Sequence, residues 1–387
     1  MPKRKVFKPP PKRVSDFFPV RSEDREQPAL PMKMPSPTVS TANREARTTP
    51  VTTAADSGAP DINGDLIQLT AQRSLPSGVV NNMTAATEFF LLGFQSNQNL
   101  RLSLFCIFLV IYCGTICGNL LIITLVSTSK NLQTPMYFFI SQLSISDILV
   151  ITDVVPNLLY LLLNNGGTIT FSDCITQLYF LCAPEVFECF LLTVMSYDRY
   201  VAICNPLRYS IIMTSGHCVI LTITCWLLGF SAVLIYIIKM AKLIFCGPHV
   251  IDHLFCDIVP LLDLSCSDTF IIHLEIYLLT IPFVLFPTAM IFLSYTYIVL
   301  AILKISSNTG SLKAFSTCSS HLIVVVIFYW SLFCVYVVPT KGQTVTIGKI
   351  LSLLYTVFTP LINPIIYSLR NKDIMKAIQE KISRHMS

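Results

Sequence analysis

The sequence predicts an all-α membrane protein, a seven-transmembrane helix bundle with a disordered N-terminal extension and a short C-terminal amphipathic helix. Composition is one reason, because 53% of the 387 residues are hydrophobic and only 13% are charged. Soluble globular domains rarely have that balance. The length of the apolar runs is the other reason, since a helix needs about 20 apolar residues to cross a bilayer core.

Residues 1–80 differ in kind from the rest of the chain. They hold more than half of the 23 prolines, an excess of Lys and Arg over Asp and Glu, and no apolar periodicity. Such a stretch cannot bury enough apolar surface to fold alone, so we expect a disordered, basic, proline-rich extension. Its start, "PKRKVFKPPPKR", would suit nuclear import or nucleic-acid binding. The apolar runs that follow oppose this interpretation, and we expect no nucleic-acid partner.

Seven apolar runs follow the extension. Five carry no charge and cover 102–126, 219–238, 276–303, 322–339 and 350–369. Two more, 137–163 and 174–197, are mostly apolar but carry Asp147 and Asp153, and Glu185 and Glu188, respectively. The runs define a membrane domain over 102–369, with an outer segment over 81–101 and a tail over 370–387 that we expect to form the amphipathic helix.

The distribution of Lys and Arg between the loops predicts the orientation, because cytoplasmic loops carry the excess. If the loop after the first run is cytoplasmic, that side carries twice as many of these residues as the outer side. The cytoplasmic set is Lys130, Arg199, Arg208, Lys304, Lys313, Arg370, Lys372, Lys376, Lys381 and Arg384, and the outer set is Arg101, Lys239, Lys242, Lys341 and Lys349. We therefore expect a multi-pass plasma-membrane protein with its N-terminus outside and its C-terminus in the cytoplasm.

Two kinds of residue agree with this orientation. Asn82-Met83-Thr84 is a glycosylation sequon about twenty residues before the first run, on the outer side. Four of the 14 cysteines fall in outer regions, where disulfides form: Cys174, Cys246, Cys256 and Cys266. Their spacing alone leaves all three pairings open.

Polar residues inside the runs suggest an interior network, since each is costly in a membrane unless it is paired, hydrated or functional. Asp147 and Glu188 lie near mid-depth of the second and third runs, and Asn119 and Asn363 lie at comparable depth in the first and seventh. The network could switch between two arrangements and hold a cation with water through Asp147 and Glu188. Alternatively, it could be a static hydrogen-bonded cluster that only holds the helices together. Pro364 favours the switch, because it removes a hydrogen bond from its helix.

Six motifs along the chain resemble those of one family. They are "GN" at 118–119, "PMYFFISQLSISD" at 135–147, "MSYDRYVAICNPLRY" at 195–209, "SYTYI" at 294–298, "KAFSTCSSHL" at 313–322 and "PLINPIIYSLRNKD" at 360–373. Together they resemble the signatures of vertebrate odorant receptors, within the rhodopsin-like class of G-protein-coupled receptors. The resemblance runs from about residue 88 to residue 381.

The resemblance implies a function and an activation switch. It implies a receptor that binds a small volatile odorant and activates a stimulatory, olfactory-type heterotrimeric G protein, which raises cyclic AMP. In its Asp-Arg-Tyr motif, Arg199 would leave its resting contacts and engage the G protein. The implied switch residues are Asp198, Arg199, Tyr200, Tyr295, His321, Asn363, Pro364 and Tyr367.

The resemblance also implies one disulfide pairing, Cys174 with Cys256 and Cys246 with Cys266. An apolar ligand pocket is expected between the outer halves of the helices. Counting helical turns from Arg199 places Cys182, Glu185, Val186 and Cys189 on one face of the third run. The resemblance adds Leu279, Thr280, Phe283, Tyr329, Leu332, Tyr336 and Thr356. For each apolar member, ordinary helix packing is the alternative.

Two residues of this region are open to more than one interpretation. Glu185 could contact the odorant, bind a cation, or be protonated and bonded to a neighbouring helix. Amine receptors of this class carry an Asp at the position held here by Leu181, which disfavours a direct amine-receptor assignment. Trp330, where the family usually has Gly, could narrow the pocket or face lipid.

Other classes of protein are less well supported. His249, His253 and Cys256 have a spacing that could ligate a metal, but a disulfide-bonded Cys256 could not act as a thiolate ligand. No phosphate-binding loop, zinc-protease motif or nucleophile elbow is present, so we expect neither an enzyme nor a cofactor. A channel or transporter is the remaining alternative, although related halves and broken helices are not evident.

Overall fold

The computed structural model describes residues 87–386 except 247, 268–269, 305–307 and 337–344. All of them belong to the unit Val79–Ser387. The extension 1–80 and the sequon at Asn82 lie outside the described residues, as do the side chains of Leu279, Thr280 and Tyr336.

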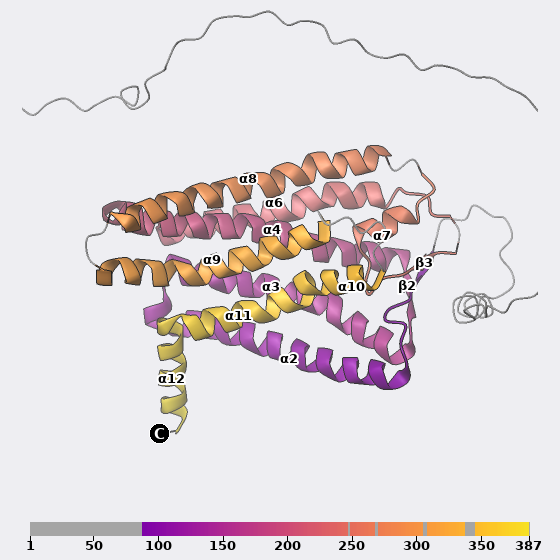
Figure 1. The fold of residues 1–387 in the computed structure, drawn as a ribbon, viewed down its shortest axis with the longest axis horizontal. Coiled ribbons are helices and arrows are strands. Elements are labelled where there is room, and N and C mark those ends of the chain that lie inside the picture. Colours follow the sequence, from indigo (N-terminus) through magenta and orange to yellow (C-terminus); the bar gives the residue numbers. More distant parts are fainter. Residues whose placement is uncertain (1–86, 247, 268–269, 305–307, 337–344, 387) are drawn as a thin grey trace, which may run out of the picture. The chain divides into compact units, whose positions relative to one another are not determined.

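Long helices lying side by side make up the fold (Figure 1). They are α2 (Gln98–Thr128), α3 (Pro135–Asn164), α4 (Phe171–Cys204), α6 (Ser215–Met240), α8 (Phe270–Leu303), α9 (Asn308–Tyr336), and α10 (Val345–Leu353) continued by η4 (Leu354–Phe358) and α11 (Thr359–Arg370). Within the described ranges, six helices are long and apolar enough to cross a membrane, and α9 adds the shorter apolar segment Cys318–Cys334. The predicted seven-helix bundle is confirmed.

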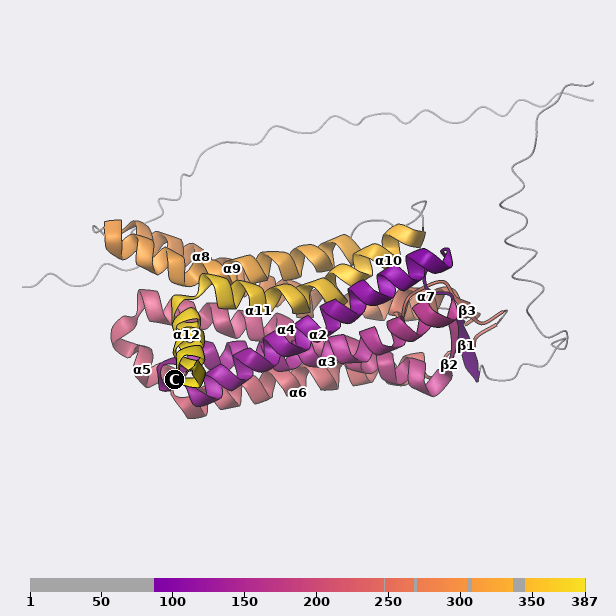
Figure 2. The same cartoon turned by 90° about the horizontal axis from the view of Figure 1, so that it is seen from below.

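The last helix, α12 (Lys372–Met386), is the predicted amphipathic helix of the tail. Ile374 and Ala377 are buried one turn apart, whereas Lys376 and Glu380 point to the outside. Figure 2 shows α12 and the short α5 (Tyr209–Ile212) at one end of the bundle and the strands with α7 (Ile258–Asp263) at the other. The remaining short turns are η2 (Lys130–Leu132) and η3 (Pro206–Arg208).

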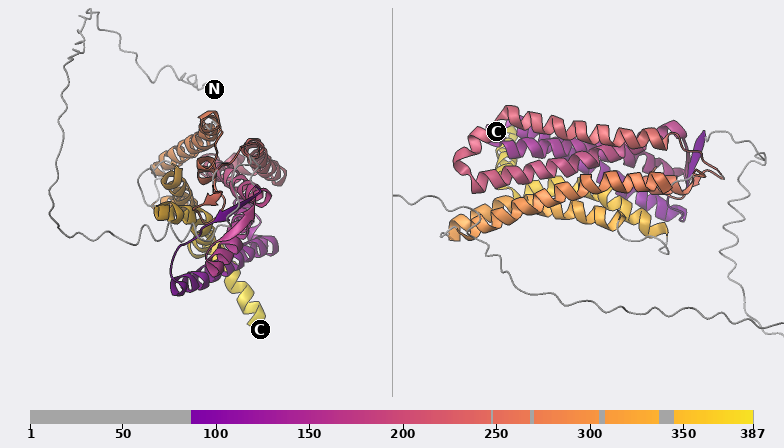
Figure 3. Two further views of the ribbon diagram at one scale, coloured as in Figure 1. Left: turned by 90° about the vertical axis from the view of Figure 1, so that its right-hand side faces the viewer. Right: turned by 90° about the horizontal axis from the view of Figure 1, so that it is seen from above.

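Helix α4 holds the centre of the bundle, because it contacts α3, α6, α8 and α9. The end-on view in Figure 3 shows the helices arranged around one another. Of the spans, α3 and α4 bury the largest share of their residues, while α2 and α8 leave most of theirs on the outer surface. A residue on α4 can therefore act on several neighbouring helices at once.

The contact between α4 and α6 is close because Gly229 has no side chain. A Cβ there would lie 2.7 Å from the Ala183 carbonyl oxygen and 3.1 Å from the Phe187 backbone nitrogen. The Phe187 and Trp226 rings stack beside it with centroids 3.6 Å apart. These contacts fix α6 against the central helix.

Replacing Gly229 with Ala is expected to destabilise the protein by about 1–3 kcal/mol, because the added methyl meets backbone that cannot move aside. Gly216→Ala in the same helix is the matched control, since a Cβ there meets nothing within 4 Å. Thermal denaturation of the purified protein in detergent would compare the two variants. Equal stability of both would contradict the proposed tight packing.

A small sheet covers the end of the bundle opposite α12 (Figure 2). The sequence-based expectation of an all-α chain did not include this sheet. β1 (Glu88–Leu91) pairs antiparallel with β2 (Gly167–Thr170) and parallel with β3 (Val250–Ile251), in the order β2-β1-β3. The Phe89 side chain is buried beneath the sheet and contacts the rings of Phe171 and Phe245. We call β1, β2, β3 and the described residues of the segment 241–267 the outer cap, after the side of the membrane on which the distribution of Lys and Arg is expected to place them.

Two disulfides hold the outer cap. Cys174, at the start of α4, is joined to Cys256, and Cys246 is joined to Cys266. This is the pairing that the family resemblance implies. Cys174 and Cys256 are fully buried, and the Gln177 side-chain oxygen accepts a hydrogen bond from the Cys256 backbone N–H at 3.0 Å.

Candidate functional site

At the end of α4, Asp198 and Arg199 form a buried ion pair. The Arg199 Nε donates to Asp198 Oδ2 at 2.9 Å, and the Arg199 Nη2 contacts the same oxygen. Asp198 is fully buried and Arg199 is 9% exposed. Arginine does not lose its charge in proteins, so in this position it requires a charged or strongly polar partner.

The second oxygen of Asp198 accepts a hydrogen bond from Tyr209. The Tyr209 hydroxyl lies 2.8 Å from Asp198 Oδ1. Burial raises the pKa of Tyr209, and the neighbouring Asp198 charge raises this pKa further, so the hydroxyl keeps the proton that it donates. Sequence reasoning assigns Tyr209 no role, since no spacing rule connects it to a carboxylate eleven residues earlier.

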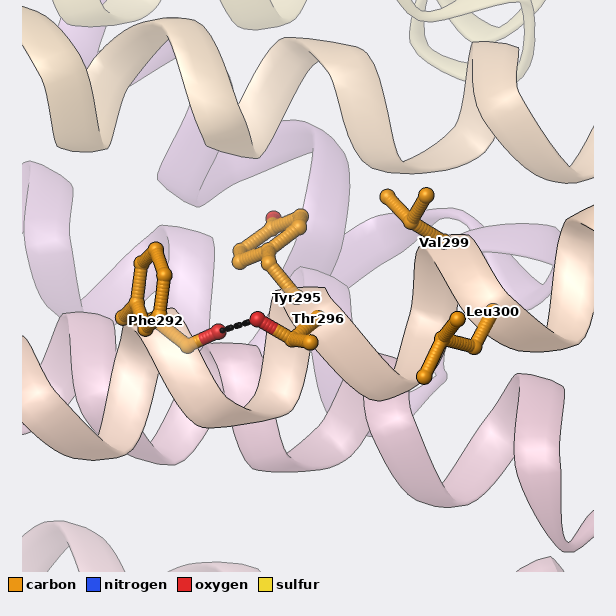
Figure 4. Close-up of a pocket in the computed structure, with 5 residues that line it drawn as sticks. All are labelled: Phe292, Tyr295, Thr296, Val299 and Leu300. Atoms are coloured by element: carbon orange, nitrogen blue, oxygen red, sulfur yellow. Dashed lines mark hydrogen bonds between the residues drawn. The ribbon is translucent and has the colours of Figure 1, made fainter.

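Tyr295 and His321 connect α8 to α9 near the same end. The Tyr295 hydroxyl and His321 Nδ1 are 2.6 Å apart, and the two rings stack at 20°. His321 is fully buried. Tyr295 also lines a pocket of about 310 Å³ with Phe292, Thr296, Val299 and Leu300. Figure 4 shows these side chains on successive turns of α8, with the Thr296 hydroxyl bonded to the Phe292 carbonyl.

The polar residues of the interior lie on four helices. Asn363 on α11 donates to both carboxylate oxygens of Asp147 on α3, at 3.0 and 3.2 Å. Asn119 on α2 donates to the Pro360 carbonyl at 3.2 Å. Glu188 on α4 acts electrostatically on Asp147. Asn119 thus joins the cluster through the α11 backbone rather than through Asp147.

The α11 helix is loosened where this cluster attaches. The π-helical turn η4 precedes it, and the Thr359 hydroxyl donates to the Leu354 carbonyl at 3.0 Å across that turn. Pro364 follows Asn363 and lies against Gly118, where a Cβ would be 3.2 Å from the proline ring. Tyr367, one turn further, is buried, and its hydroxyl has no hydrogen-bond partner among the described residues.

The predicted pocket residues are only partly brought together. Cys189, Leu332 and Tyr329 belong to one packed cluster. The centroids of the Phe283 and Phe190 rings are 5.7 Å apart. The Thr356 hydroxyl is bonded to the Ser352 carbonyl of its own helix at 2.9 Å. Cys182 and Val186 are half-buried on α4. Neither the pocket beside Tyr295 nor a pocket at the opposite end of the bundle includes these residues, so the predicted ligand pocket stays a prediction.

Glu185 and Trp330 can be placed more definitely. Glu185 Oε1 is buried and has no hydrogen-bond partner in the described part of the chain. The nearby charge is that of Asp257 in the outer cap and of Glu188 on the same helix. Trp330 is 64% exposed and stacks on Phe333. Its ring therefore faces the outer surface of the bundle instead of narrowing a cavity.

A charged cluster joins α10 to the outer cap, and sequence reasoning missed it. Lys349 is only 6% exposed, and its ammonium donates to the Gly93 carbonyl at 2.7 Å and to Asp252 Oδ1 at 2.5 Å. Next to it, His253 Nε2 lies 3.2 Å from the Ser352 hydroxyl. Burial lowers the pKa of His253, and the Asp257 charge and the hydrogen bond to the Phe255 carbonyl offset only part of that effect.

The metal-site alternative for this loop is not supported by the geometry. Cys256 is bonded to Cys174 and has no thiolate to offer. His249 lies with its Nε2 3.4 Å from the Phe245 carbonyl, and His253 Nδ1 lies 3.1 Å from the Phe255 carbonyl. Among the described residues there is no group of three His, Cys, Asp or Glu side chains that could hold a metal ion.

The fold is that of rhodopsin, a bundle of seven membrane helices. Squid rhodopsin superposes on it with a TM-score of 0.60 at 18% identity, over 74% of this chain and 82% of that one. The sequence comparison is more specific, because the family model for olfactory receptors matches residues 105–385. The chain therefore belongs to the olfactory receptor family.

Individual olfactory receptors match this chain over nearly their whole length. Human olfactory receptor 10A7 is 44% identical over 306 residues, which cover 79% of this chain and 97% of that protein. Human olfactory receptor 11L1 is 44% identical over 303 residues (78% and 94%), and mouse olfactory receptor 6B9 is 43% identical over 304 (79% and 96%). The protein is thus a multi-pass membrane receptor and not an enzyme, which confirms the family expected from the motifs.

Proposed function

We propose that this protein binds a small volatile odorant within the helix bundle and activates a stimulatory, olfactory-type heterotrimeric G protein, which raises cyclic AMP. The observation that carries the proposal is the buried Asp198–Arg199 pair at one end of the central helix. In this proposal the N-terminus is outside the plasma membrane, Asn82 is glycosylated, and the C-terminus is cytoplasmic. The excess of Lys and Arg in the loops at the Arg199 end supports that orientation.

The ion pair supplies the resting state of the switch. Arg199 must keep a partner because its charge is permanent, and a partner protein that offers acceptors can replace Asp198. Asp198 does not become an isolated buried charge in that exchange, because Tyr209 still donates to it. Such an exchange of partners is what a two-state population shift requires.

The interior contacts connect this switch to the rest of the bundle. Tyr295 and His321 hold α8 to α9 beside Arg199, whose charge is felt by both side chains. The Asn363–Asp147 bonds hold the loosened α11 to α3. A ligand that shifts any of these helices alters the surroundings of Arg199, because α4 contacts α3, α8 and α9.

Glu185 is the side chain that we assign to ligand contact. It lies four turns of α4 toward the outer end from Arg199, and its Oε1 is a buried acceptor without a partner in the described part of the chain. A buried carboxyl oxygen without a hydrogen-bond partner lowers the stability of the protein, because its lost contact with water is not replaced. A hydroxyl or other donor on an odorant would satisfy it.

The test stimulates cells that express the receptor and the olfactory-type G protein with a panel of odorants, and measures cyclic AMP. For an activating odorant that carries a donor, Glu185→Gln is expected to lower potency by a few-fold, because Gln replaces one acceptor oxygen by an N–H and one hydrogen bond contributes about 0.5–1.5 kcal/mol. Glu380→Gln, on the exposed face of α12, is the matched control.

Surface display of each variant is measured by antibody labelling, so that a lost response is not confused with lost expression. Unchanged potency in displayed Glu185→Gln would remove Glu185 from the site. A ligand-evoked current that persists without any G protein would favour a channel and contradict the proposed coupling.

A further inference from the structure

A second pocket lies at the outer end of the bundle, away from the predicted ligand site. Its volume is about 310 Å³, at the lower end of the range of roughly 300–1,000 Å³ that ligand sites occupy. Four parts of the chain line it: the segment after β1, the start of α2, the outer cap and α10. The lining residues are Phe94, Gln95, Ser96, Leu100, Leu104, Asp252, Thr346 and Lys349.

Lys349 gives this pocket a hydrogen-bond donor that is held in a fixed position. Its ammonium is buried and is held by two acceptors, the Gly93 carbonyl and Asp252 Oδ1. An ammonium group has three donors, so one N–H has no acceptor among these contacts. Because both holding contacts are 2.7 Å or shorter, the donor is fixed in place and a ligand acceptor need not order it.

Ser96 supplies a second polar group on the same pocket. Its Oγ is buried and has no hydrogen-bond partner among the described residues. A buried hydroxyl without a partner is costly, and a bound molecule with an oxygen acceptor would relieve that cost. Phe94, Leu100 and Leu104 form the apolar part of the lining.

The charge of the pocket selects among ligands. Lys349 and Asp252 neutralise each other, so a carboxylate would meet the Asp252 charge and an amine would meet the Lys349 charge. A neutral carbonyl oxygen meets neither penalty and accepts from the fixed ammonium. A hydrocarbon chain attached to it would cover the apolar lining.

We propose that this outer pocket is a separate binding site for uncharged, oxygen-bearing apolar molecules, namely aliphatic ketones, aldehydes and esters. The carbonyl accepts from Lys349 and Ser96, and the chain packs on Phe94, Leu100 and Leu104. The proposal rests on the proposed odorant-binding function only for its choice of ligand class. A molecule bound in this pocket would also hold α10 to the outer cap, because it would contact Lys349 of α10 beside Asp252 of the outer cap.

The test uses photolabelling of the full-length receptor in lipid nanodiscs with an eight-carbon methyl ketone that carries a diazirine in its chain. Mass spectrometry is expected to find label on the peptides spanning 94–104 and 346–352. Unlabelled 2-octanone is expected to compete at least ten-fold better than octanoate or octylamine. This readout needs no signalling, so failure of the proposed G-protein coupling would leave it measurable.

Two variants test the pocket itself. Leu104→Trp is expected to fill it and remove the label, and Lys349→Met is expected to remove the preference for 2-octanone over octane. Thr346→Trp, at the exposed rim, serves in place of Leu104→Trp if that variant is not displayed at the surface. Label confined to peptides of α4 and α9, equal competition by octanoate or octylamine, or label unchanged in the displayed pocket-filling variant would each overturn the proposal.

Discussion

Replacing Asp198 with Asn is expected to raise cyclic AMP production in the absence of odorant by roughly ten-fold. The change keeps the size of the side chain but removes the charge that holds Arg199. A charge-assisted hydrogen bond contributes about 1.5–3 kcal/mol, and about 1.4 kcal/mol corresponds to a factor of ten in population. Because Asn keeps one neutral acceptor oxygen for Arg199, we expect a loss at the low end of this range, and the fraction of receptor with a free Arg199 rises by about a factor of ten.

Two further variants separate the parts of this switch. Tyr209→Phe removes one neutral donor from Asp198 and is expected to raise basal activity less, by a few-fold, since such a bond contributes about 1 kcal/mol. Arg199→Ala is expected to abolish G-protein signalling while odorant binding stays measurable. Basal cyclic AMP, normalised to surface display, is the measurement for Asp198→Asn and Tyr209→Phe, and odorant-evoked cyclic AMP together with odorant binding is the measurement for Arg199→Ala.

A matched control is Asp173→Asn, which changes an acid at the opposite end of the same helix. Its basal activity is expected to equal that of the unmodified receptor. Basal activity of Asp198→Asn at the level of that control would show that the ion pair does not hold the resting state. Normal signalling by Arg199→Ala would remove the arginine from G-protein contact.

The membrane helices could be predicted from the sequence because their signal is local. A bilayer crossing needs about 20 apolar residues in one run, and each run carries that signal without help from the others. The described helices extend beyond the apolar runs: α4 begins at Phe171 and ends at Cys204, whereas the predicted run covers 174–197. Polar turns at helix ends contribute no hydrophobic signal, so the sequence places these ends poorly.

The outer cap could not be predicted because its contacts are not local. β1 has four residues, and it pairs with β2 almost eighty positions away and with β3 more than 150 positions away. No alternation within four residues specifies such partners. The chain is brought into register by the bundle below it and by the Cys174–Cys256 bond.

The residues of the candidate site also fall into those that the sequence reveals and those that only the structure reveals. Asp198, Arg199, Asp147 and Asn363 stand out in the sequence, because charged and polar residues are rare within apolar runs. The sequence shows Lys349 only as one positive charge in a loop, whereas in the structure its side chain is buried and bonded to Gly93 and Asp252. Its contacts come from two segments that are distant in sequence, so the residues around Lys349 do not reveal them.

Removing the Cys174–Cys256 disulfide is expected to cost more stability than removing Cys246–Cys266. The first bond closes a separation of 82 residues and the second a separation of 20. In the chain-entropy description the longer loop adds about 1 kcal/mol to a typical contribution of about 2–5 kcal/mol. The buried position of Cys174 and Cys256 adds to the difference, because Ser at either place leaves a hydroxyl in an apolar cluster.

The measurement compares thermal inactivation of Cys174→Ser and Cys246→Ser in detergent, together with their surface display. Cys174→Ser is expected to lower both more strongly, since the bond ties the outer cap to the central helix while Cys246–Cys266 closes a loop within the cap. Cys106→Ser, an exposed free thiol on α2, is the control and is expected to change neither. Equal losses in the two disulfide variants, or a larger loss in Cys246→Ser, would mean that the cap is held to the bundle by its packing and hydrogen bonds rather than by its bond to α4.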